Sequence, residues 1–382
     1  MPIDRDIFDE LFVLELANNH WGSLERGLQI IHDFGRVVRY NGVRAAIKLQ
    51  FRDIDTFVHR DYRHRTDIRY IGKTLATKLS QAEIGRMVDA IRATGCIPMA
   101  TPFDEHSVDL CVKFGMPIVK LASSDLNDWV LIERLAKTRK PIIASTGGSS
   151  VKDVDDLVTF YENRSIPLAI NHCVSLYPCE DEDLQLNQID YLRGRYPGVT
   201  IGFSTHEYTD WETSVAIAYG KGARTFERHI DIERDEIPVS PYCSTPDQAD
   251  RWFRAFARTK AMCGPAGTSK RIPGRKETEY LEALVRGVYA ARDLPEGHEL
   301  TAEDYYLAVP LLRGQLSCRE LIEGERLTRA LRANAPVALD AMDTPYARSP
   351  EMLRRVARRG LDPVAEPGPP SNGHAGASIV RS

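Results

Sequence analysis

Eight short apolar runs, each followed by a longer stretch of helical character, recur along the first 230 residues of the chain. Behind the first run, Leu24, Leu28, Ile31 and Phe34 lie three or four positions apart, which places them on one face of a helix. Strands that alternate with helices in this way predict an α/β fold with a parallel sheet. The runs are FVLELA (12–17), AAIKLQF (45–51), IPMATPF (97–103), IVKLASS (118–124), PIIASTG (141–147), LAINHCV (168–174), TIGFSTH (200–206) and RTFERHI (224–230).

Polar residues at the ends of these runs favour a closed barrel over an open sheet. Each run is apolar at its start and turns polar at its carboxyl end, from Glu15 in the first run to His229 in the eighth. In a TIM (β/α)8 barrel, which takes about 250 residues, those strand ends meet at one rim and surround the active site. A doubly wound open sheet uses the same alternation, so the number of units alone does not exclude it. The polar ends lead us to expect a TIM barrel with one depression at its rim.

The composition excludes several classes of protein. With 43% hydrophobic and 27% charged residues, the 382-residue chain is typical of a soluble globular protein. Its 50 Lys and Arg against 54 Asp and Glu leave a net charge of -4, so we expect no nucleic-acid partner and no membrane. The acidic start and the lack of any apolar run of about 18 residues predict a cytoplasmic protein. The seven cysteines form no CxxC pair, and we expect reduced thiols, mostly in the core.

Changes in composition along the chain predict four segments. The barrel is expected to occupy residues 1–262, and a linker rich in Gly, Pro and Ser follows it at residues 263–279. Strand-like runs around VRGVYAARDL and YYLAVPLL predict a small, mostly β domain at residues 280–340. Residues 341–382 form a C-terminal extension, which from about residue 363 has too few apolar residues to order itself.

His206 and His229 end the seventh and eighth runs, so a barrel brings both imidazoles to the same rim. A single strand-end histidine is more often a hydrogen-bonded rim residue, but two on adjacent strands favour a metal site. Two histidines do not complete a structural zinc site, and water and substrate oxygens would fill the other positions. The pair predicts an exchangeable divalent metal, Mn or Mg, that acts as a Lewis acid.

Lys48 and Lys120 lie inside apolar runs, where solvated lysines are rare. Compact positive charge beside hydroxyl donors fits a phosphate or a carboxylate, so these side chains predict a site for an anionic substrate. A Schiff-base lysine is the alternative, but it requires a lowered lysine pKa, and a nearby metal makes metal-assisted chemistry simpler. The flanking hydroxyls belong to Thr101, Ser123, Ser145, Thr146 and Ser204.

Glu15 follows the apolar residues of the first run. At the rim that carries the two histidines, its carboxylate is placed to accept a proton. A structural ion pair with a rim lysine is the alternative role, and position alone does not separate the two.

Eight longer motifs follow one another along the first 260 residues: ELANNHWGS, AIKLQF, TPFDEHSVD, IVKLASSDLNDWVLIERLA, KPIIASTGGSS, INHCVSLYPCEDEDLQLNQI, IGFSTHE and ARTFERHI. In this order they resemble the sialic acid synthase (N-acylneuraminate synthase) family. The resemblance implies a metal-bearing TIM barrel that condenses phosphoenolpyruvate with an aminosugar aldehyde. It also implies an antifreeze-like (SAF) domain after the barrel, which ARDLPEGHELTAEDY and IEGERLTRAL resemble.

The resemblance implies a role for each residue that matches a family motif. His206 and His229 would bind the metal, and Glu15 would be the acid/base residue near the water that attacks carbon 2 of phosphoenolpyruvate. The phosphate and carboxylate would be held by Lys48, Thr101, Lys120, Ser123, Ser145 and Ser204.

The same resemblance places the sugar, and the chain departs from the family there. Gln50 and Tyr177 would face the sugar, and Asn171 and His172 would line the same pocket. Where the family has an aspartate that grips the sugar, this chain has Ser240 in IERDEIPVSPYCS. The departure predicts an altered acceptor pocket.

Two further stretches bear on the charge of the acceptor and on a protein partner. The loop HRDYRHRTDIRY is unusually basic, with Arg60, Arg63, Arg65 and Arg69. A solvated charged face is its default interpretation, and recognition of a phosphorylated or acidic acceptor is the alternative.

In the family an arginine of the antifreeze-like domain reaches into a neighbouring subunit's barrel, and Arg313 in VPLLRGQLS matches it. A homodimer in which the C-terminal domain contacts the partner barrel is therefore implied.

Together these features predict a synthase that joins phosphoenolpyruvate to an aldose, phosphorylated or not, to give a nonulosonic acid and phosphate. A metal-dependent pyruvate aldolase or lyase is one alternative, although it would need no phosphate site. A non-catalytic sugar-binding paralogue is another, which the altered sugar loop permits. The combination of Glu15, two histidines and two lysines favours the enzyme, because binding alone needs neither a Lewis acid nor a general base.

Overall fold

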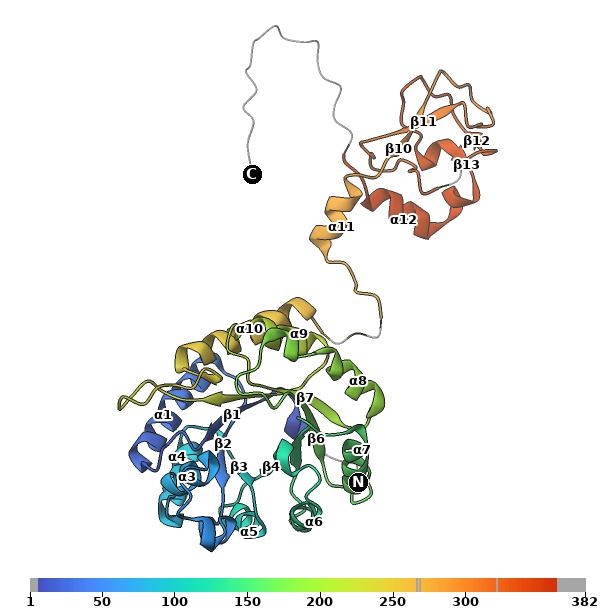
Figure 1. Ribbon diagram of the computed structural model, residues 1–382. Helices are drawn as coiled ribbons and strands as arrows, with labels where there is room; N and C mark the ends of the chain where they lie inside the picture. The colour runs from blue at the N-terminus through green and yellow to red at the C-terminus, as the bar shows by residue number, and fades with distance from the viewer. Residues whose placement is uncertain (1–5, 266, 268, 321, 363–382) are drawn as a thin grey trace, which may run out of the picture. The chain divides into compact units, whose positions relative to one another are not determined.

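A computed structural model describes residues 6–265, 267, 269–320 and 322–362 of the chain. Its internal contacts divide the chain into two compact units, residues 1–266 and 267–382 (Figure 1). Each unit has a hydrophobic core of its own.

The first unit is a closed ring of eight parallel strands, and the prediction of a TIM barrel is confirmed. Each strand pairs with the next one along the chain, and β8 pairs with β1 to close the ring. A short strand, β9 (Cys243–Ser244), adds to the outside of β8. The ring consists of β1 (Leu11–Ala17), β2 (Ala45–Phe51), β3 (Ile97–Pro102), β4 (Ile118–Leu121), β5 (Ile142–Ser145), β6 (Leu168–Cys173), β7 (Thr200–Thr205) and β8 (Thr225–Ile230).

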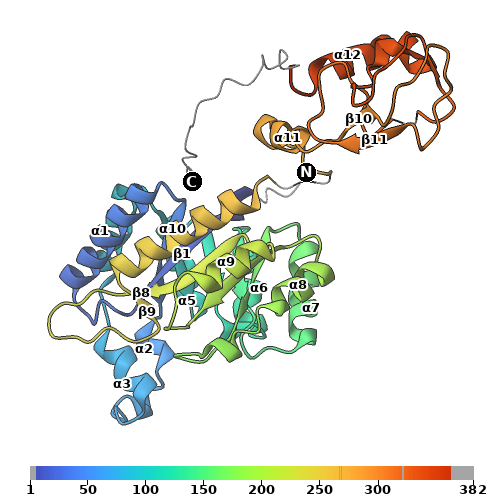
Figure 2. The same ribbon diagram turned by 90° about the horizontal axis from the view of Figure 1, so that it is seen from above.

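Helices surround the ring and connect successive strands (Figure 1). Several of them begin at a serine or aspartate whose side chain accepts a hydrogen bond from the backbone N–H three positions on, as a helix start requires. Figure 2 shows α10 lying between α1 and α9, against both of which it packs. The helices are α1 (Leu24–Asn41), α2 (Ile54–Phe57), α3 (Arg69–Ala76), α4 (Gln81–Ala93), α5 (Glu105–Lys113), α6 (Trp129–Lys137), α7 (Val151–Glu162), α8 (Asn187–Arg195), α9 (Thr213–Gly220) and α10 (Pro246–Cys263). In the described part of the chain, no helix has the length and apolarity that a membrane crossing demands.

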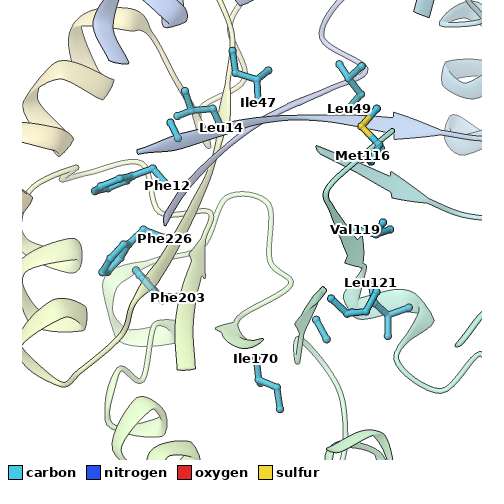
Figure 3. Close-up of a cluster of buried hydrophobic side chains, with 14 of the residues drawn as sticks. Phe12, Leu14, Ile47, Leu49, Met116, Val119, Leu121, Ile170, Phe203 and Phe226 are labelled. Carbon is cyan, nitrogen blue, oxygen red and sulfur yellow. The ribbon is translucent and has the colours of Figure 1, made fainter. Parts of the chain in front are cut away.

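Alternation along the strands divides the barrel's apolar residues into two sets. One set, which includes Phe12, Ile47, Ile170 and Phe226, points away from the centre of the ring and packs under the helices (Figure 3). The Phe12 ring, for example, meets Trp252 of α10 edge to face with ring centroids 4.8 Å apart. The other set fills the amino-terminal half of the interior and consists of Phe8, Leu11, Val13, Ala46, Met99, Ile118, Ile143 and Ala169. The carboxyl half is thereby left to the polar residues.

The second unit contains two small antiparallel sheets. Its first element is α11 (Arg275–Glu282), which starts inside the stretch expected to be a linker and continues past its end at residue 279. The first sheet pairs β10 (Gly287–Ala290) with β11 (Tyr305–Ala308), and the second pairs β12 (Arg326–Leu327) with β13 (Met342–Asp343). The expected C-terminal extension contributes α12 (Pro350–Arg358), whose Val356 is 3% exposed in the same core. Residues 363–382, the part of the extension expected not to order itself, lie outside the described residues.

Asp304 is the main buried charge of the second unit, with no exposed surface. Its Oδ2 atom accepts hydrogen bonds from the Thr301 backbone N–H, 2.8 Å away, and from His298 Nε2, 2.9 Å away. Arg292 Nη2 lies 2.5 Å from Oδ1. These donors, His298 first among them, hold the pKa of Asp304 well below its usual range.

We expect Asp304→Asn to destabilise the second unit at neutral pH by about 1.5 to 3 kcal/mol, because donors arranged for a carboxylate lose their charged partner. A carboxyl group whose folded-state pKa is lowered contributes stability above its unfolded pKa of about 3.9, and loses this contribution as the pH falls toward the folded value. The difference between wild type and variant should therefore be largest near neutral pH and shrink in acid. Urea titrations at several pH values, followed by hydrogen exchange of peptides from residues 285–342, would measure it. A difference that stays constant from pH 7 to pH 2 would contradict this explanation.

Candidate active site

A cavity of about 750 Å³ opens at the carboxyl ends of the barrel strands. Its volume is in the range of pockets that enclose small-molecule ligands. Most of the residues chosen from the sequence line it: Glu15, Lys48, Gln50, Thr101, Lys120, Ser123, Ser145, Tyr177, Ser204, His206 and His229.

Strand register aligns three of these residues at the point where the barrel closes. Glu15 on β1 is level with Lys48 on β2 and with His229 on β8. A β-bulge follows at once, because the register with β2 shifts between Glu15 and Ala17, and Ala17 has a positive φ of 51°. Bulges beside active sites redirect the following side chains, and here Asn18 next lines the cavity.

Lys48 lies between two buried carboxylates. Its Nζ atom forms an ion pair with Glu15 and lies 3.2 Å from Glu227 Oε1 and 3.0 Å from Thr101 Oγ1. Burial lowers the pKa of Lys48 to about 8, although Glu227 opposes the shift. Burial also opposes ionisation of Glu227, but Lys120 and Lys48 outweigh it and lower the pKa of that carboxyl. The ion pair considered as an alternative role for Glu15 is therefore present.

Lys120 is buried but has no carboxylate partner among the described residues. Only 2% of its surface is exposed, and its Nζ atom donates to Ser145 Oγ at 2.7 Å and to the Leu121 carbonyl at 3.0 Å. Glu227 acts on Lys120 only through space, and a buried cation that touches no counter-ion is costly unless a ligand provides one. Because Lys120 lines the cavity together with the Ser123 and Ser204 hydroxyls, this end of the cavity is suited to an anion.

The two histidines face each other across the cavity wall with ring centroids 5.4 Å apart. Burial lowers the pKa of His206 to about 4 and that of His229 well below its usual range, so both imidazoles are neutral at pH 7. His206 Nδ1 donates to the Val174 carbonyl at 2.8 Å, which leaves Nε2 as the nitrogen with a free lone pair. Neutral imidazoles with one nitrogen fixed in this way are suited to metal binding.

No larger metal cluster is present in the described part of the chain, where no group of three or more His, Cys, Asp and Glu side chains is arranged to hold a metal. The two imidazoles fit a metal that takes its remaining ligands from water or substrate.

A second buried ion pair lies behind the histidines. Arg228, which has no exposed surface, places Nη1 2.5 Å from Glu207 Oε1 and donates from Nε to Ser244 Oγ at 2.9 Å. Glu207 also accepts a hydrogen bond from Ser214 at 2.5 Å. These contacts fix the ends of β7, β8 and β9 to one another, and with them the two histidines that they carry.

Four residues expected to surround the ligand do not line the cavity: Thr146, Asn171, His172 and Ser240. Thr146 donates from Oγ1 to the Asn171 carbonyl at 3.3 Å. Asn171 lies one layer deeper inside the barrel, where its Oδ1 accepts from Thr225 at 2.5 Å. That layer needs Gly202 on β7, since a Cβ atom there would lie 2.2 Å from Asn171 Oδ1. His172 points outward, with Nε2 2.7 Å from the Leu184 carbonyl.

Ser240 and Arg313, the residue expected to reach a partner's barrel, belong to other parts of the chain. Ser240 stays off the cavity, but Tyr242 of the same loop lines it. Arg313 lies in the second unit, where its Nε atom is 2.9 Å from Asp362 Oδ1.

Sequence reasoning missed Glu227 and Arg52 as cavity residues. Glu227 precedes His229 by two positions on β8, so the period of two that places His229 in the cavity also places Glu227 there. Arg52 lies just past the end of β2, and it continues the series Lys48, Gln50 on the inner face.

Three arginines of the basic loop, Arg60, Arg63 and Arg65, do not line the cavity. Arg60 lies 3.5 Å from Asp61, and Arg65 forms a two-pronged pair with Asp67. Arg63 donates to the backbone carbonyls of Val58 and Asp55, just before the loop. The Arg69 side chain lies outside the described part of the structure. The interpretation of this loop as a solvated charged face fits these contacts.

Comparisons with known proteins match both units. The model of the NeuB family matches residues 41–265, and that of the SAF domain matches residues 285–341. An N-acetylneuraminate-9-phosphate synthase of Drosophila melanogaster is 26% identical over 89% of this chain and 91% of its own. An N,N'-diacetyllegionaminic acid synthase of Legionella pneumophila is 23% identical over 84% of this chain and 91% of its own. A putative spore coat polysaccharide biosynthesis protein E from Chromobacterium violaceum superimposes with a TM-score of 0.81 at 36% identity, covering 88% of this chain and all of the other.

The unpaired charge of Lys120 leads to a stability prediction. We expect Lys120→Met to raise the free energy of unfolding of the ligand-free barrel by about 1 kcal/mol or more, because an apolar side chain replaces a buried cation. Inorganic phosphate should stabilise the wild type, by about 2.7 kcal/mol at one hundred times its Kd, and should stabilise the variant much less. All four tryptophans precede residue 262, so urea unfolding followed by tryptophan fluorescence reports the barrel. Equal stabilisation of both proteins by phosphate would contradict the assignment.

Proposed function

Because the chain belongs to the NeuB family, we propose that it condenses phosphoenolpyruvate with an aldose to give a nonulosonic acid and phosphate. The observation that carries the proposal is the pair of cavity lysines with different partners. Lys48 is in ion pairs with two carboxylates, whereas Lys120 forms no ion pair with a carboxylate among the described residues. A phosphate or carboxylate of phosphoenolpyruvate would satisfy Lys120 and the hydroxyls beside it.

We propose that His206 and His229 hold a divalent metal, Mn or Mg, through their neutral imidazoles. When bound there, such an ion would act as a Lewis acid toward the aldehyde oxygen of the acceptor. The hydrogen bond from His206 Nδ1 to Val174 supports this role, because it leaves Nε2 free.

The reaction balances with the groups of this chain. The C3 carbon of phosphoenolpyruvate bonds to the aldehyde carbon with the electron pair of its C2–C3 double bond, and the aldehyde oxygen takes up a proton. Water adds to C2 and gives a proton to Glu15, which balances the one taken up. The bond from C2 to the bridging phosphate oxygen then breaks, and phosphate leaves with the bonding pair. The C2 hydroxyl passes its proton to the departing phosphate oxygen and becomes the ketone. Lys120 and its neighbouring hydroxyls stabilise the charge of the departing phosphate.

The two alternatives predict different properties. A pyruvate aldolase or lyase has no phosphate to bind, so the unpaired Lys120 argues against it. A non-catalytic sugar-binding protein has no need of the carboxylates that surround Lys48. Binding without turnover, seen as ligand-dependent shifts in Tm with no phosphate released, would favour that alternative.

We extend the proposal to the setting of the enzyme. It is a cytoplasmic homodimer in which the C-terminal unit of one copy, including Arg313, contacts the barrel of the other. Arg313 is about half exposed and so is accessible for such a contact.

Phosphate release from phosphoenolpyruvate tests the proposed reaction. With manganese present, we expect release that depends on one aldose in a panel of N-acetylmannosamine, its 6-phosphate, mannose and diamino-trideoxy sugars. His206→Ala should lower this rate by about 100-fold or more, because it removes a group that supports charge stabilisation in the transition state. Release that is independent of any aldose, or unaffected by the substitution, would contradict the proposal.

The two carboxylates beside Lys48 can be told apart by matched substitutions. If Glu15 takes the proton from water, Glu15→Gln should lower kcat by about 10² to 10⁴-fold. Glu227→Gln should have the smaller effect on kcat, because in this scheme Glu227 neutralises Lys48 and transfers no proton. Steady-state kinetics with saturating phosphoenolpyruvate would compare them. A larger loss of kcat in Glu227→Gln would assign the base to the other carboxylate.

A further inference from the structure

Arg52, like Lys73 and Asp125, is a charged residue of the cavity that the reaction described above does not use. Its side chain lines the cavity beside Phe103, and its guanidinium lies 3.7 Å from the centre of that ring. Its Nη1 atom donates to Gln50 Oε1 at 2.9 Å, which fixes the guanidinium at the wall. A planar cation stacked on an aromatic ring and held by one hydrogen bond still presents other N–H donors.

The charge of Arg52 is not neutralised by an ion pair with any carboxylate that the structure describes. Its Nε atom is buried and has no hydrogen-bond partner. Burial lowers the pKa of Arg52, and Asp125 and Asp104 act on it only through space. Asp104 is already committed, because its Oδ1 and Oδ2 atoms accept from the backbone N–H groups of Ser107 and Asp53. Burial raises the pKa of Asp125, which weakens it as a counter-ion.

The position of Arg52 along β2 shows which part of a substrate it would meet. Lys48, Gln50 and Arg52 follow one another at intervals of two residues on the inner side of the strand and its extension. At about 3.3 Å per residue, Arg52 is roughly 13 Å along the chain from Lys48. Phosphoenolpyruvate would occupy the end of the cavity near Lys48 and Lys120, so the aldehyde carbon of the acceptor lies there. Arg52 is then near the opposite end of the acceptor.

We propose that the acceptor carries a negatively charged group, a phosphate ester or a carboxylate, at the end remote from its aldehyde, and that Arg52 binds this group. The inference rests on the proposed function and names the substrate class for the same site. It replaces the arginines of the loop at residues 59–70 as the source of charge recognition, since Arg60, Arg63 and Arg65 do not line the cavity. A guanidinium is well matched to either oxyanion, because its parallel N–H groups fit two oxygens at once.

The test compares acceptors that differ in the charge at this end. Mannose, mannose 6-phosphate and mannuronate, with N-acetylmannosamine and its 6-phosphate, would be assayed by phosphate release from phosphoenolpyruvate. For the wild type we expect kcat/KM to be about 10- to 100-fold higher with a charged acceptor than with its uncharged counterpart. Preference for the 6-phosphates or for mannuronate identifies the anion as a phosphate ester or a carboxylate.

Matched variants separate anion binding from a general effect on the cavity. Arg52→Gln should remove most of the 10- to 100-fold preference, whereas Arg52→Lys, which keeps a charge, should retain part of it. Arg65→Gln removes an exposed arginine of the neighbouring loop, and it should leave the preference unchanged. If Arg52→Gln lowers kcat/KM equally for charged and uncharged acceptors, Arg52 serves only to hold Gln50 in place, and the inference is overturned.

A direct binding measurement keeps this inference separate from the proposed function. If no acceptor releases phosphate, the proposed reaction fails, but titration calorimetry of mannose 6-phosphate, mannuronate and mannose still compares wild type with Arg52→Gln. Tighter binding of a charged sugar that is lost in the variant would support the role of Arg52 in a protein of other function. Binding of the uncharged sugar at least as tight as that of both charged sugars would overturn it.

Discussion

The ion pairs of Lys48 are the interaction on which the rest of the site depends. Lys48 belongs to β2, and its two carboxylate partners, Glu15 and Glu227, come from β1 and β8, the two strands that close the barrel. Groups buried this deeply lose hydration, so each is tolerated only because the others are held at contact distance. Replacing such a cluster by apolar residues often stabilises a protein, which indicates that these charges are kept for chemistry.

The charged residues of the cavity fall into two groups, those that form ion pairs and those that do not. Lys48 is paired with opposite charges. Thr101 accepts a hydrogen bond from it, and strand register places His229 level with Glu15. Lys120 and Arg52 form no ion pair with a carboxylate among the residues that the structure describes, and carboxylates act on them only through space. These are the two places at which the proposals above put the anionic groups of the substrates. Groups held in advance need little rearrangement when a ligand arrives, and this is how a folded site stabilises developing charge.

The sequence was sufficient to predict the barrel, because the period of two in each strand and the polar strand ends are local properties of the chain. It was also sufficient to gather Lys48, Lys120 and the two histidines at one rim, since all four are on the inner face of a strand. The sequence was insufficient to predict the position of Asn171, because its depth in the barrel depends on where each strand ends relative to its neighbours. It also failed at His172, which follows Asn171 and so points to the opposite side. Ionic contacts between strands, such as that of Glu227 with Lys48, depend on register and could not be read from any one segment.

Closure of the ring also has a consequence for the biosynthesis of the protein. β1 and β8 pair Leu11 with Thr225, residues that are more than two hundred positions apart, so this contact forms late by any route that builds local structure first. Glu15 emerges from the ribosome long before Glu227 and His229 do. Until β8 has been synthesised, one edge of β1 has no strand to pair with. A nascent chain of this kind exposes an unpaired strand edge and is prone to association with other chains. Glu15 and Glu227 come from the first and the last strand of the barrel. A barrel that is only partly synthesised or partly folded therefore cannot assemble the cluster around Lys48 and has no activity, so turnover reports that the domain has been completed.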